Sequence, residues 1–254
     1  MKVSIITVVR NRESSIRNAI KSVLSQNYPN IEYIVIDGDS SDNTFEIVKD
    51  YRKEIAYCIS EPDDGIYYAM NKGMKFANGN VIGILNSDDI FYNENTITSV
   101  VQAIKKHNVD SCHGDEIIIN HNDKVIRYCK SMNDVNELFD SGRHPHHGTF
   151  FVKKEVYEKY GYFDTLFKRA ADYDLMLRFL IKNKISTYYL QEPLVVMRSG
   201  GESQKNLINR IKANYECFLA YRKYGLKKGI FFIFKKPLSK LQEYFRAFKM
   251  NRNI

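Results

Sequence analysis

The sequence predicts an α/β fold in which a mostly parallel, doubly wound β-sheet carries helices on both faces. Two patterns lead to this prediction. Short β-branched apolar runs alternate, through the first half of the chain, with segments whose apolar residues recur at helical spacing. Polar clusters follow the strand-like runs, as they do where parallel strands end at one ligand-binding edge. A length of 254 residues with 44% hydrophobic and 27% charged residues suits one globular unit of this class.

The first half alternates regularly between the two element types. Continuous apolar runs are typical of strands that are buried on both faces, and they predict strands at Val3–Val8, Tyr33–Ile36, Ile55–Ser60 and Val81–Leu85. Helical spacing of the apolar residues predicts helices at Ser14–Leu24, Asp42–Tyr51, Ile66–Phe76 and Thr96–Lys106. Asp42 is expected to be an N-cap, and Asn78-Gly79 closes the third helix.

The second half is less regular. A hairpin is expected over Cys112–Arg127, with its turn at Asn120–Asp123. The later elements are a strand and a helix at Thr149–Val152 and Lys153–Tyr160, then a helix and a strand at Ala171–Ile181 and Ser186–Leu190. The chain reads as helical and basic from Asn206 onward. Because no repeat or linker interrupts it, we expect one domain over residues 1–220 and a tail over residues 221–254.

The net charge of +8 is concentrated in the tail. Residues 1–220 hold 28 Lys and Arg against 29 Asp and Glu, whereas residues 221–254 hold 10 Lys and Arg and a single acidic residue. The tail is also rich in Phe, Tyr, Ile and Leu, a composition typical of amphipathic segments at membrane interfaces. We therefore expect an anionic membrane surface as its partner. Nucleic acid is disfavoured because the body has no nucleic-acid motif, and packing of the tail on the body is the remaining alternative.

The cysteines and the apolar runs indicate the compartment. The four cysteines form no CxxC motif, and a chain of this size needs no disulfides, so a reduced, cytoplasmic setting is the simpler interpretation. No run of about 18 apolar residues predicts a membrane-spanning helix, and the first apolar stretch is too short for a signal peptide. Zinc is disfavoured at Cys112, His113, His121 and Cys129, because their spacing matches no common zinc pattern.

Carboxylates are frequent after the predicted strands. Six of them are expected at one edge of the sheet, at Asp37, Asp39, Asp63, Asp64, Asp88 and Asp89. Like charges at one edge repel unless a cation joins them, and Mg²⁺ or Mn²⁺ prefers oxygen ligands. The turn after the first strand contains no glycine, which excludes the dinucleotide fingerprint and the P-loop. A nucleotide held through a metal on its diphosphate is compatible with this pattern.

The order and spacing of six motifs carry a family resemblance. The motifs lie at Val3–Thr7, Ser22–Tyr33, Ile36–Thr44, Ser60–Tyr67, Ala69–Gly73 and Leu85–Asp89. Across residues 2–202 the chain resembles the family 2 glycosyltransferases with the GT-A fold. It is most similar to the bacterial branch that builds O-antigen, capsule and colanic-acid-type polysaccharides.

The resemblance implies a function and a set of roles. The function is inverting transfer of a sugar from a nucleotide-sugar, with UDP favoured, to a hydroxyl of a growing, lipid-linked surface polysaccharide. The acceptor would be a polyprenyl-diphosphate-linked saccharide, and the enzyme would be peripheral on the cytoplasmic face of the inner membrane. Asp88 is implied as the ligand of Mn²⁺ or Mg²⁺ and Asp172 as the catalytic base, with His146 and Asp89 at the acceptor edge. The implied donor-binding residues are Thr7, Asn11, Asp37, Asp39, Asp63, Asn71, Asn86, Ser87 and Arg198.

Two departures from the family pattern keep alternatives open. Asn86 stands where the family has the first Asp of its D-x-D motif, and Ala171 stands where it has a Glu before the base. A membrane-associated polysaccharide-assembly protein without catalysis therefore remains an alternative. A sugar-nucleotide pyrophosphorylase is the other, although that class needs a Gly-rich loop after the first strand. Asp172 also fits a helix N-cap, His144 and His147 are expected at the surface, and a homo-oligomer stays open.

Overall fold

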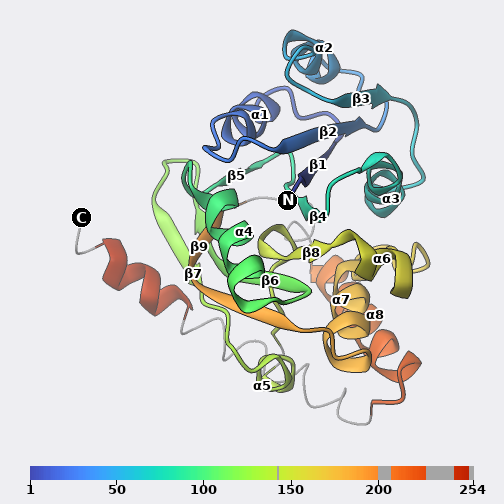
Figure 1. The fold of residues 1–254 in the computed structure, drawn as a ribbon, viewed down its shortest axis with the longest axis vertical. Helices are drawn as coiled ribbons and strands as arrows, with labels where there is room; N and C mark the ends of the chain where they lie inside the picture. The colour runs from blue at the N-terminus through green and yellow to red at the C-terminus, as the bar shows by residue number, and fades with distance from the viewer. Residues whose placement is uncertain (142, 200–206, 227–242, 252–254) are drawn as a thin grey trace.

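A computed structural model describes residues 1–141, 143–199, 207–226 and 243–251 (Figure 1). The strands are β1 Val3–Val9, β2 Ile31–Asp37, β3 Tyr57–Ser60, β4 Val81–Ile84, β5 Asp89–Phe91, β6 Ser111–Ile119, β7 Val125–Cys129, β8 Phe151–Lys153 and β9 Thr187–Arg198. The α-helices are α1 Ile16–Leu24, α2 Thr44–Asp50, α3 Ile66–Phe76, α4 Thr96–His107, α5 Val135–Asp140, α6 Lys154–Tyr160, α7 Ala171–Met176 and α8 Leu207–Lys223. A 3₁₀ turn covers His147–Thr149, α7 continues as a π-helix over Leu177–Lys182, and residues 243–251 are helical.

The sheet combines a parallel half with a mixed half. Its strand order is β3-β2-β1-β4-β8-β6-β9-β5, and β7 pairs with β6. The strands β3, β2, β1 and β4 are parallel, as predicted. Antiparallel pairs begin where β8 meets β4, and they recur between β6 and β7, β6 and β8, and β5 and β9. The expected parallel pairing therefore holds through β3, β2, β1 and β4, and it recurs between β6 and β9. The antiparallel pairs make the second half of the sheet mixed.

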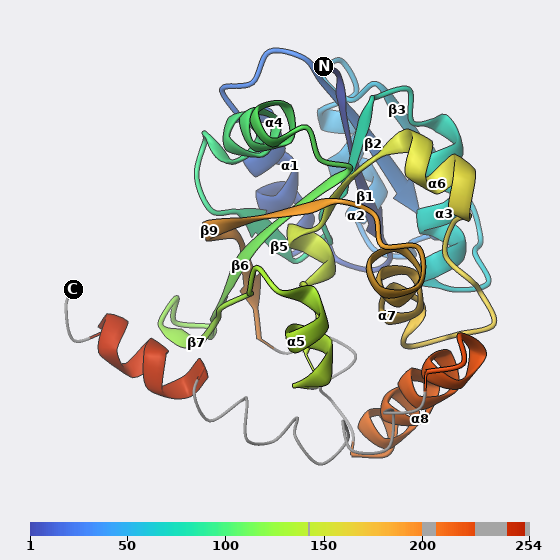
Figure 2. The same cartoon turned by 60° about the horizontal axis from the view of Figure 1, so that its bottom comes forward.

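Helices cover both faces of the sheet, as predicted (Figures 1 and 2). Alternate residues of β1 point to opposite faces: Ile6 and Val8 pack with α3, α6, α7 and α8, whereas Ile5 and Val9 pack with α1, α2 and α4. The approach of α3 to β1 is close enough to require glycine, because a Cβ on Gly73 would lie 2.5 Å from Ile6 Cγ2. This two-sided core fixes the strand ends that carry the polar loops.

Several elements differ from the prediction. The three-residue strand β5 and the six-residue helix α5 were not predicted, since segments this short give no periodic pattern. The strand expected at Ser186–Leu190 runs on to Arg198, and its register with β6 shifts near Pro193. Within the described residues, no helix has both the length and the apolar composition needed to cross a bilayer.

Helix α8 docks behind α7 and crosses the boundary expected at residue 220. Glu216 of α8 accepts hydrogen bonds from the backbone N–H groups of Arg169 and Ala170, at 2.7 and 3.0 Å, and so caps the start of α7. Further along α8, Lys223 lies 3.0 Å from the buried carboxylate of Asp174. Burial lowers the pKa of Lys223, but its hydrogen bonds to Asp164 and Asp174 raise the pKa overall. The helix thus positions the first turn of α7, which carries Asp172.

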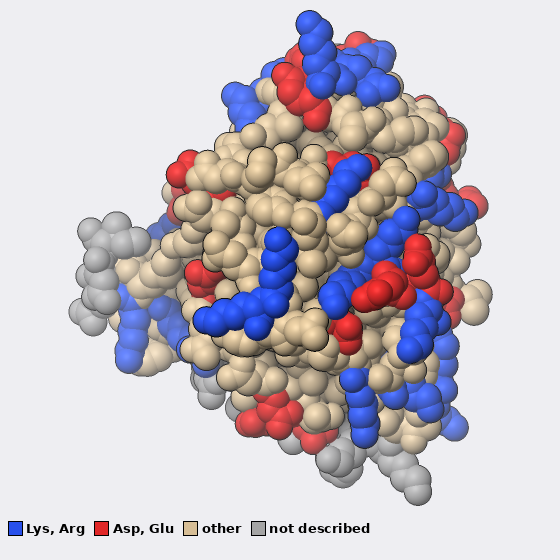
Figure 3. Space-filling view, in the orientation of Figure 1, with Lys and Arg blue, Asp and Glu red and all other residues tan. Residues whose placement is uncertain are grey.

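The helix over residues 243–251 contacts the β6–β7 hairpin. The buried carboxylate of Glu243 pairs with Arg127 of β7, and the amide of Asn251 donates to the Val125 carbonyl at 2.7 Å. Part of the expected tail therefore packs on the body. On the face shown in Figure 3, Lys and Arg are interspersed with Asp and Glu.

The buried carboxylate of Glu32, which pairs with the more exposed Lys2, gives a prediction for stability. The carboxylate of Glu32 accepts hydrogen bonds from Lys2, Ser4 and the backbone N–H of Asn78. Burial raises its pKa, but these donors lower the pKa of Glu32 overall. Glu32→Gln should lower the free energy of unfolding at pH 7 by about 1–3 kcal/mol.

The pH dependence of this loss has a definite sign. Since the folded pKa of Glu32 lies below its unfolded value of about 4.3, its contribution is complete above that pH and is lost as the pH falls through the folded pKa. Urea unfolding of wild type and variant should therefore converge in acid. Glu46→Gln, which breaks an exposed pair with Lys49, should change stability by less than about 0.5 kcal/mol and is the control. If the difference in the free energy of unfolding between wild type and Glu32→Gln does not change with pH, the charge of Glu32 is not involved.

Candidate active site

The Asp37 side chain links the loop after β2 to the end of β3. Its carboxylate is fully buried, and it accepts hydrogen bonds from the backbone N–H and hydroxyl of Ser40 and from the hydroxyl of Ser60. Asn11, after β1, has a φ of 51°, and its side-chain oxygen accepts from the Ser41 backbone N–H at 2.9 Å. Asp37 and Asn11 therefore both hold the loop that follows β2. Asp39 in this loop is exposed and has a φ of 58°.

The carboxylate of Asp63 lies beside this loop. One carboxylate oxygen accepts from Lys72 at 2.6 Å, whereas the buried Oδ2 has no hydrogen-bond partner within the described ranges. A Cβ built on Gly38 would lie 3.6 Å from this Oδ2, so the oxygen faces the turn that follows β2. Burial lowers the pKa of Lys72, but Asp63 and Glu61 raise the pKa overall. The orphaned oxygen is available to a hydrogen-bond donor of a ligand, as a nucleoside would offer.

The β4–β5 turn gathers the oxygen atoms expected of a metal site. Asp88 is partly exposed, Ser87 is 6% exposed and Asp89 is 2% exposed. The side-chain N–H of Asn86 donates to Asp89 Oδ2 at 2.9 Å, while the buried oxygens Asn86 Oδ1 and Asp89 Oδ1 find no partner in the described part of the chain. Burial, and then the charges of Asp88 and Glu116, raise the pKa of Asp89 well above its usual range. Unpaired oxygens beside a partly exposed carboxylate are the donors that Mn²⁺ or Mg²⁺ prefers.

The hydrogen bond from Asn86 to Asp89 accounts for an amide at position 86. The Asp that the family carries here would place a second negative charge against Asp89, whereas the amide donates a hydrogen bond to it. The departure from D-x-D is therefore compatible with a buried Asp89 and leaves Asp88 free to bind a cation.

Asp172 is linked to this turn through His147, which the sequence analysis placed at the surface. Nε2 of His147 lies 2.8 Å from Asn86 Nδ2, and its Nδ1 lies 3.8 Å from Asp172 Oδ2. Because the amide N–H must donate, Nε2 accepts, and a neutral His147 carries its proton on the Nδ1 that faces Asp172. Tyr67 donates a hydrogen bond to the other oxygen, Asp172 Oδ1, at 3.0 Å.

These contacts show that His147 and Tyr67 were missed by sequence reasoning. Burial, and then the Asp172 charge, raise the pKa of Tyr67 well above 10, so the phenol stays a donor. The signal that could have found His147 is its place beside His146, a residue predicted at the acceptor edge. Asp172 lies in the first turn of α7, and its side chain remains 20% exposed. The interpretation of Asp172 as an N-cap is wrong, since Ala170 occupies that position and has no capping side chain.

His146 pairs with a buried carboxylate. Its Nδ1 lies 2.8 Å from Glu116 Oε2, and its side chain is 33% exposed. Burial lowers the pKa of His146, but Glu116 and Cys129 raise the pKa well above its usual value overall. His146 therefore carries a positive charge near Asp89.

Two residues that were predicted to bind the nucleotide-sugar have side chains that contact other parts of the protein. Thr7 is fully buried, and its hydroxyl accepts from Tyr33 at 3.1 Å, which makes its side chain part of the core. The amide of Asn71 pairs with both the N–H and the carbonyl of Phe163, at 3.0 and 2.9 Å. Both functional groups of Asn71 are thus used in holding the loop before α7, and the Thr7 side chain is enclosed in the core.

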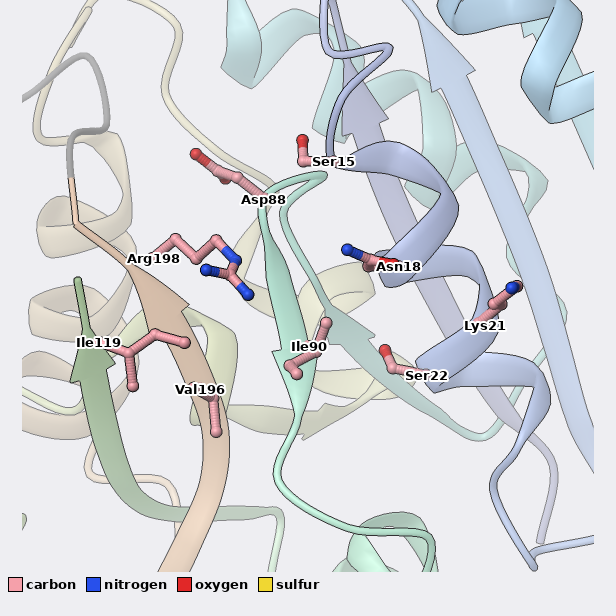
Figure 4. A pocket seen from close by; sticks show the side chains of 9 residues that line it. All are labelled: Ser15, Asn18, Lys21, Ser22, Asp88, Ile90, Ile119, Val196 and Arg198. Carbon is pink, nitrogen blue, oxygen red and sulfur yellow. The ribbon is translucent and has the colours of Figure 1, made fainter. Parts of the chain in front are cut away.

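A hollow of about 330 Å³ lies between α1, β5 and β9 (Figure 4). Asp88 lines it from the β4–β5 turn and Arg198 lines it from the end of β9, where Arg198 also forms an ion pair with Asp123 at 2.7 Å. The remaining lining residues are Ser15, Asn18, Lys21, Ser22, Ile90, Ile119 and Val196. The structure therefore brings the predicted metal ligand Asp88 and the predicted donor-binding residue Arg198 to one cavity.

Comparison with known proteins places this geometry in a family. The family model described as glycosyl transferase family 2 matches residues 4–170. A glycosyltransferase of Rickettsia typhi is 32% identical over 204 residues, which are 76% of this chain and 62% of that protein, so the chain spans less than two thirds of its length. The Escherichia coli UDP-Glc:alpha-D-GlcNAc-diphosphoundecaprenol beta-1,3-glucosyltransferase WfgD is 37% identical over 127 residues, 50% of each chain.

Solved structures confirm the fold. The complex of S. aureus TarS with UDP-GlcNAc superimposes with a TM-score of 0.69 at 19% identity, over 88% of this chain and 65% of that one. The mannosyltransferase PcManGT from Pyrobaculum calidifontis, in complex with GDP-Man and Mn²⁺, gives 0.65 at 17% identity, over 87% of this chain and 63% of that one. The predicted GT-A fold is therefore confirmed.

Proposed function

The chain belongs to glycosyl transferase family 2, and we propose that it moves a sugar from a nucleotide-sugar to an acceptor hydroxyl with inversion at the anomeric carbon. One observation carries this proposal. His147 lies between the Asp172 carboxylate, 3.8 Å from its Nδ1, and Asn86, 2.8 Å from its Nε2 in the turn that holds Asp88, so the proposed base and the proposed cation site are neighbours. A base next to a diphosphate-binding cation is the arrangement that glycosyl transfer needs.

The residues around Asp172 supply the base. The acceptor hydroxyl is a poor nucleophile near neutral pH, and a carboxylate within hydrogen-bond reach takes its proton as the new C–O bond forms. Tyr67 donates a hydrogen bond to one oxygen of Asp172, and Nδ1 of His147 faces the other oxygen at 3.8 Å, so both residues border the carboxylate. Attack from the side opposite the leaving diphosphate inverts the anomeric centre.

Asp88 is the proposed ligand of Mn²⁺ or Mg²⁺, with the orphaned oxygens of Asn86 and Asp89 beside it. A cation bound there would neutralise the charge of the leaving nucleoside diphosphate. Arg198 in the same cavity adds a second positive charge that suits phosphate. Asp37, Asn11, Asp39 and Asp63 are proposed to surround the nucleoside. UDP is the favoured nucleotide, in line with WfgD and with the TarS complex.

The acceptor is proposed to be a polyprenyl-diphosphate-linked saccharide of a surface polysaccharide, by analogy with WfgD. Exposed apolar side chains support a membrane location. Ile208, Ile211, Tyr215 and Leu219 form one stripe on α8, and Tyr244, Phe245 and Phe248 are exposed on the helix over residues 243–251. Both helices lie at the lower edge in Figure 2. With the basic tail, they would hold the enzyme on the cytoplasmic face of the inner membrane.

A donor screen followed by a transfer assay tests the activity. UDP- and GDP-sugars are screened with Mn²⁺ by thermal shift, and the stabilising donor is offered with a GlcNAc-diphospho-lipid acceptor. The expected result is release of nucleoside diphosphate, loss of activity in EDTA and a product of inverted anomeric configuration by NMR. Exchange of pyrophosphate would instead indicate a pyrophosphorylase. Neither donor binding nor transfer with any pair would favour an assembly protein without catalysis.

Membrane binding gives a separate prediction. The double variant Phe245→Ser with Phe248→Ser should weaken association with phosphatidylglycerol vesicles by about tenfold or more, since each buried Phe contributes roughly 1.5–3 kcal/mol. Co-sedimentation should also weaken as salt reduces the screening length to about 8 Å. The control, Leu24→Ser with Tyr92→Ser, removes two exposed apolar side chains from the body and should bind as wild type does. Equal loss in both variants would contradict the proposal. A change of molecular mass without vesicles would indicate a homo-oligomer contact.

A further inference from the structure

The side chains of Glu116, Cys129 and His146, which offer three different ligand atoms, lie close together. Glu116 of β6 and Cys129 of β7 are paired across the hairpin, so their side chains emerge on the same face. His146 reaches them from the loop before the 3₁₀ turn, and one ligand atom of each residue lies within 4.8 Å of the other two. Glu116 and Cys129 are 3% and 2% exposed.

The cluster has the features of a built site rather than of chance proximity. Glu116 Oε2 is buried and accepts no aligned hydrogen bond within the described residues, although His146 Nδ1 lies 2.8 Å from it. Atoms that share a zinc ion lie at about 2.0–2.3 Å from it, which leaves them roughly 3–4 Å apart. Small side-chain rotations therefore bring this set around one ion.

We propose that Glu116, Cys129 and His146 form a second metal site that binds Zn²⁺ and is separate from the Asp88 site. Thiolate, imidazole and carboxylate together suit zinc, whereas the all-oxygen set at Asp88 suits Mg²⁺ or Mn²⁺. Binding displaces the thiol proton of Cys129 and the proton that His146 shares with Glu116. Three protein ligands leave a fourth position for water. The sequence disfavoured zinc at the set Cys112, His113, His121 and Cys129. Of these, Cys129 belongs to the present cluster, whose other members are Glu116 and His146.

The site would tie two parts of the active site together. It would join the β6–β7 hairpin to His146. The residue after His146 is His147, which contacts Asn86 and faces Asp172. An ion at this point would fix the loop and so the position of His147. Zinc should therefore raise the melting temperature, since it binds only the folded arrangement.

Two measurements on the full chain test the site. The metal-free protein is titrated with Co²⁺, whose thiolate complex absorbs in the near ultraviolet, and with Zn²⁺ against a chromophoric chelator. Wild type should bind one zinc with the thiolate band present. Cys129→Ser should abolish the band and weaken zinc binding by more than the roughly 10–100-fold that loss of an outer-shell partner costs. The zinc-induced rise in melting temperature should vanish with it.

Matched variants separate the alternatives. Cys58→Ser removes a free cysteine on β3, at the other end of the sheet, and should leave the band and the affinity unchanged. Asp88→Asn should also retain the zinc. Glu116→Gln keeps the shape but removes a ligand charge, and it serves as the second variant if Cys129→Ser does not fold. Zinc binding that is equal in Cys129→Ser and Cys58→Ser, or that is lost in Asp88→Asn, would overturn the proposal.

Discussion

Asp172→Asn is expected to lower the rate of sugar transfer by about 10²–10⁴-fold while donor affinity stays nearly unchanged. An amide of the same shape cannot take the acceptor proton, but it can still accept from Tyr67, so the first turn of α7 should keep its geometry. Steady-state transfer rates and donor binding by calorimetry in Mn²⁺ separate the two effects. The fall should appear in kcat, because the lost interaction is made during bond formation.

Two variants make this result specific. Asp50→Asn, on the exposed end of α2, should transfer as wild type does. Tyr67→Phe removes a donor to Asp172 without removing the base, and it should cost less than Asp172→Asn. If Asp172→Asn loses donor binding as well, Asp172 is a structural residue and the base must be sought elsewhere.

The parallel half of the sheet was predictable because each strand is a continuous apolar run between helices. Buried parallel strands need such runs, and Ile5, Ile6, Ile34 and Val35 are fully buried on the two faces. The mixed half was less predictable. β5 is only three residues long, and β9 continues through Pro193, where a single-sequence pattern indicates an end.

The candidate site was predicted at the level of loops, and less well at the level of side chains. Asp37 and Asp88 lie at strand ends, as their positions after apolar runs indicated. Thr7 and Asn71 were assigned by their motifs, but the partners that occupy them, Tyr33 and Phe163, are distant in sequence. His147 shows the same limit, because its contacts with Asn86 and Asp172 depend on three separate loops meeting.

Ala171 stands before Asp172, where the family has a Glu, and a glutamate from another helix lies near this turn. Ala171 is fully buried in the core and offers no charge. Glu216 of α8 instead binds the N–H groups of Arg169 and Ala170 and so anchors the start of the helix that holds Asp172. A residue beyond the matched family region thus supports the turn that carries Asp172, which no local motif could indicate.

Asp88→Asn is expected to reduce transfer by about 10³-fold or more, since a cation on the leaving diphosphate supplies several kcal/mol of stabilisation in the transition state. The neutral amide cannot offset the charge of Mn²⁺, so donor binding should also lose its dependence on the metal. This loss of donor affinity distinguishes Asp88→Asn from Asp172→Asn. Calorimetric titration of the donor with and without Mn²⁺ measures it directly.

The control for Asp88→Asn is another carboxylate of the strand-end loops. Asp64→Asn removes an exposed charge near Asp63, and it should retain both transfer and metal-dependent donor binding. Equal losses in the two variants would mean that the metal responds to the summed charge of the edge rather than to Asp88. Unchanged turnover in Asp88→Asn would remove the metal assignment, because Asn86 and Asp89 are held together by their own hydrogen bond and the partly exposed Asp88 is the carboxylate of this turn best placed to meet a cation from solvent.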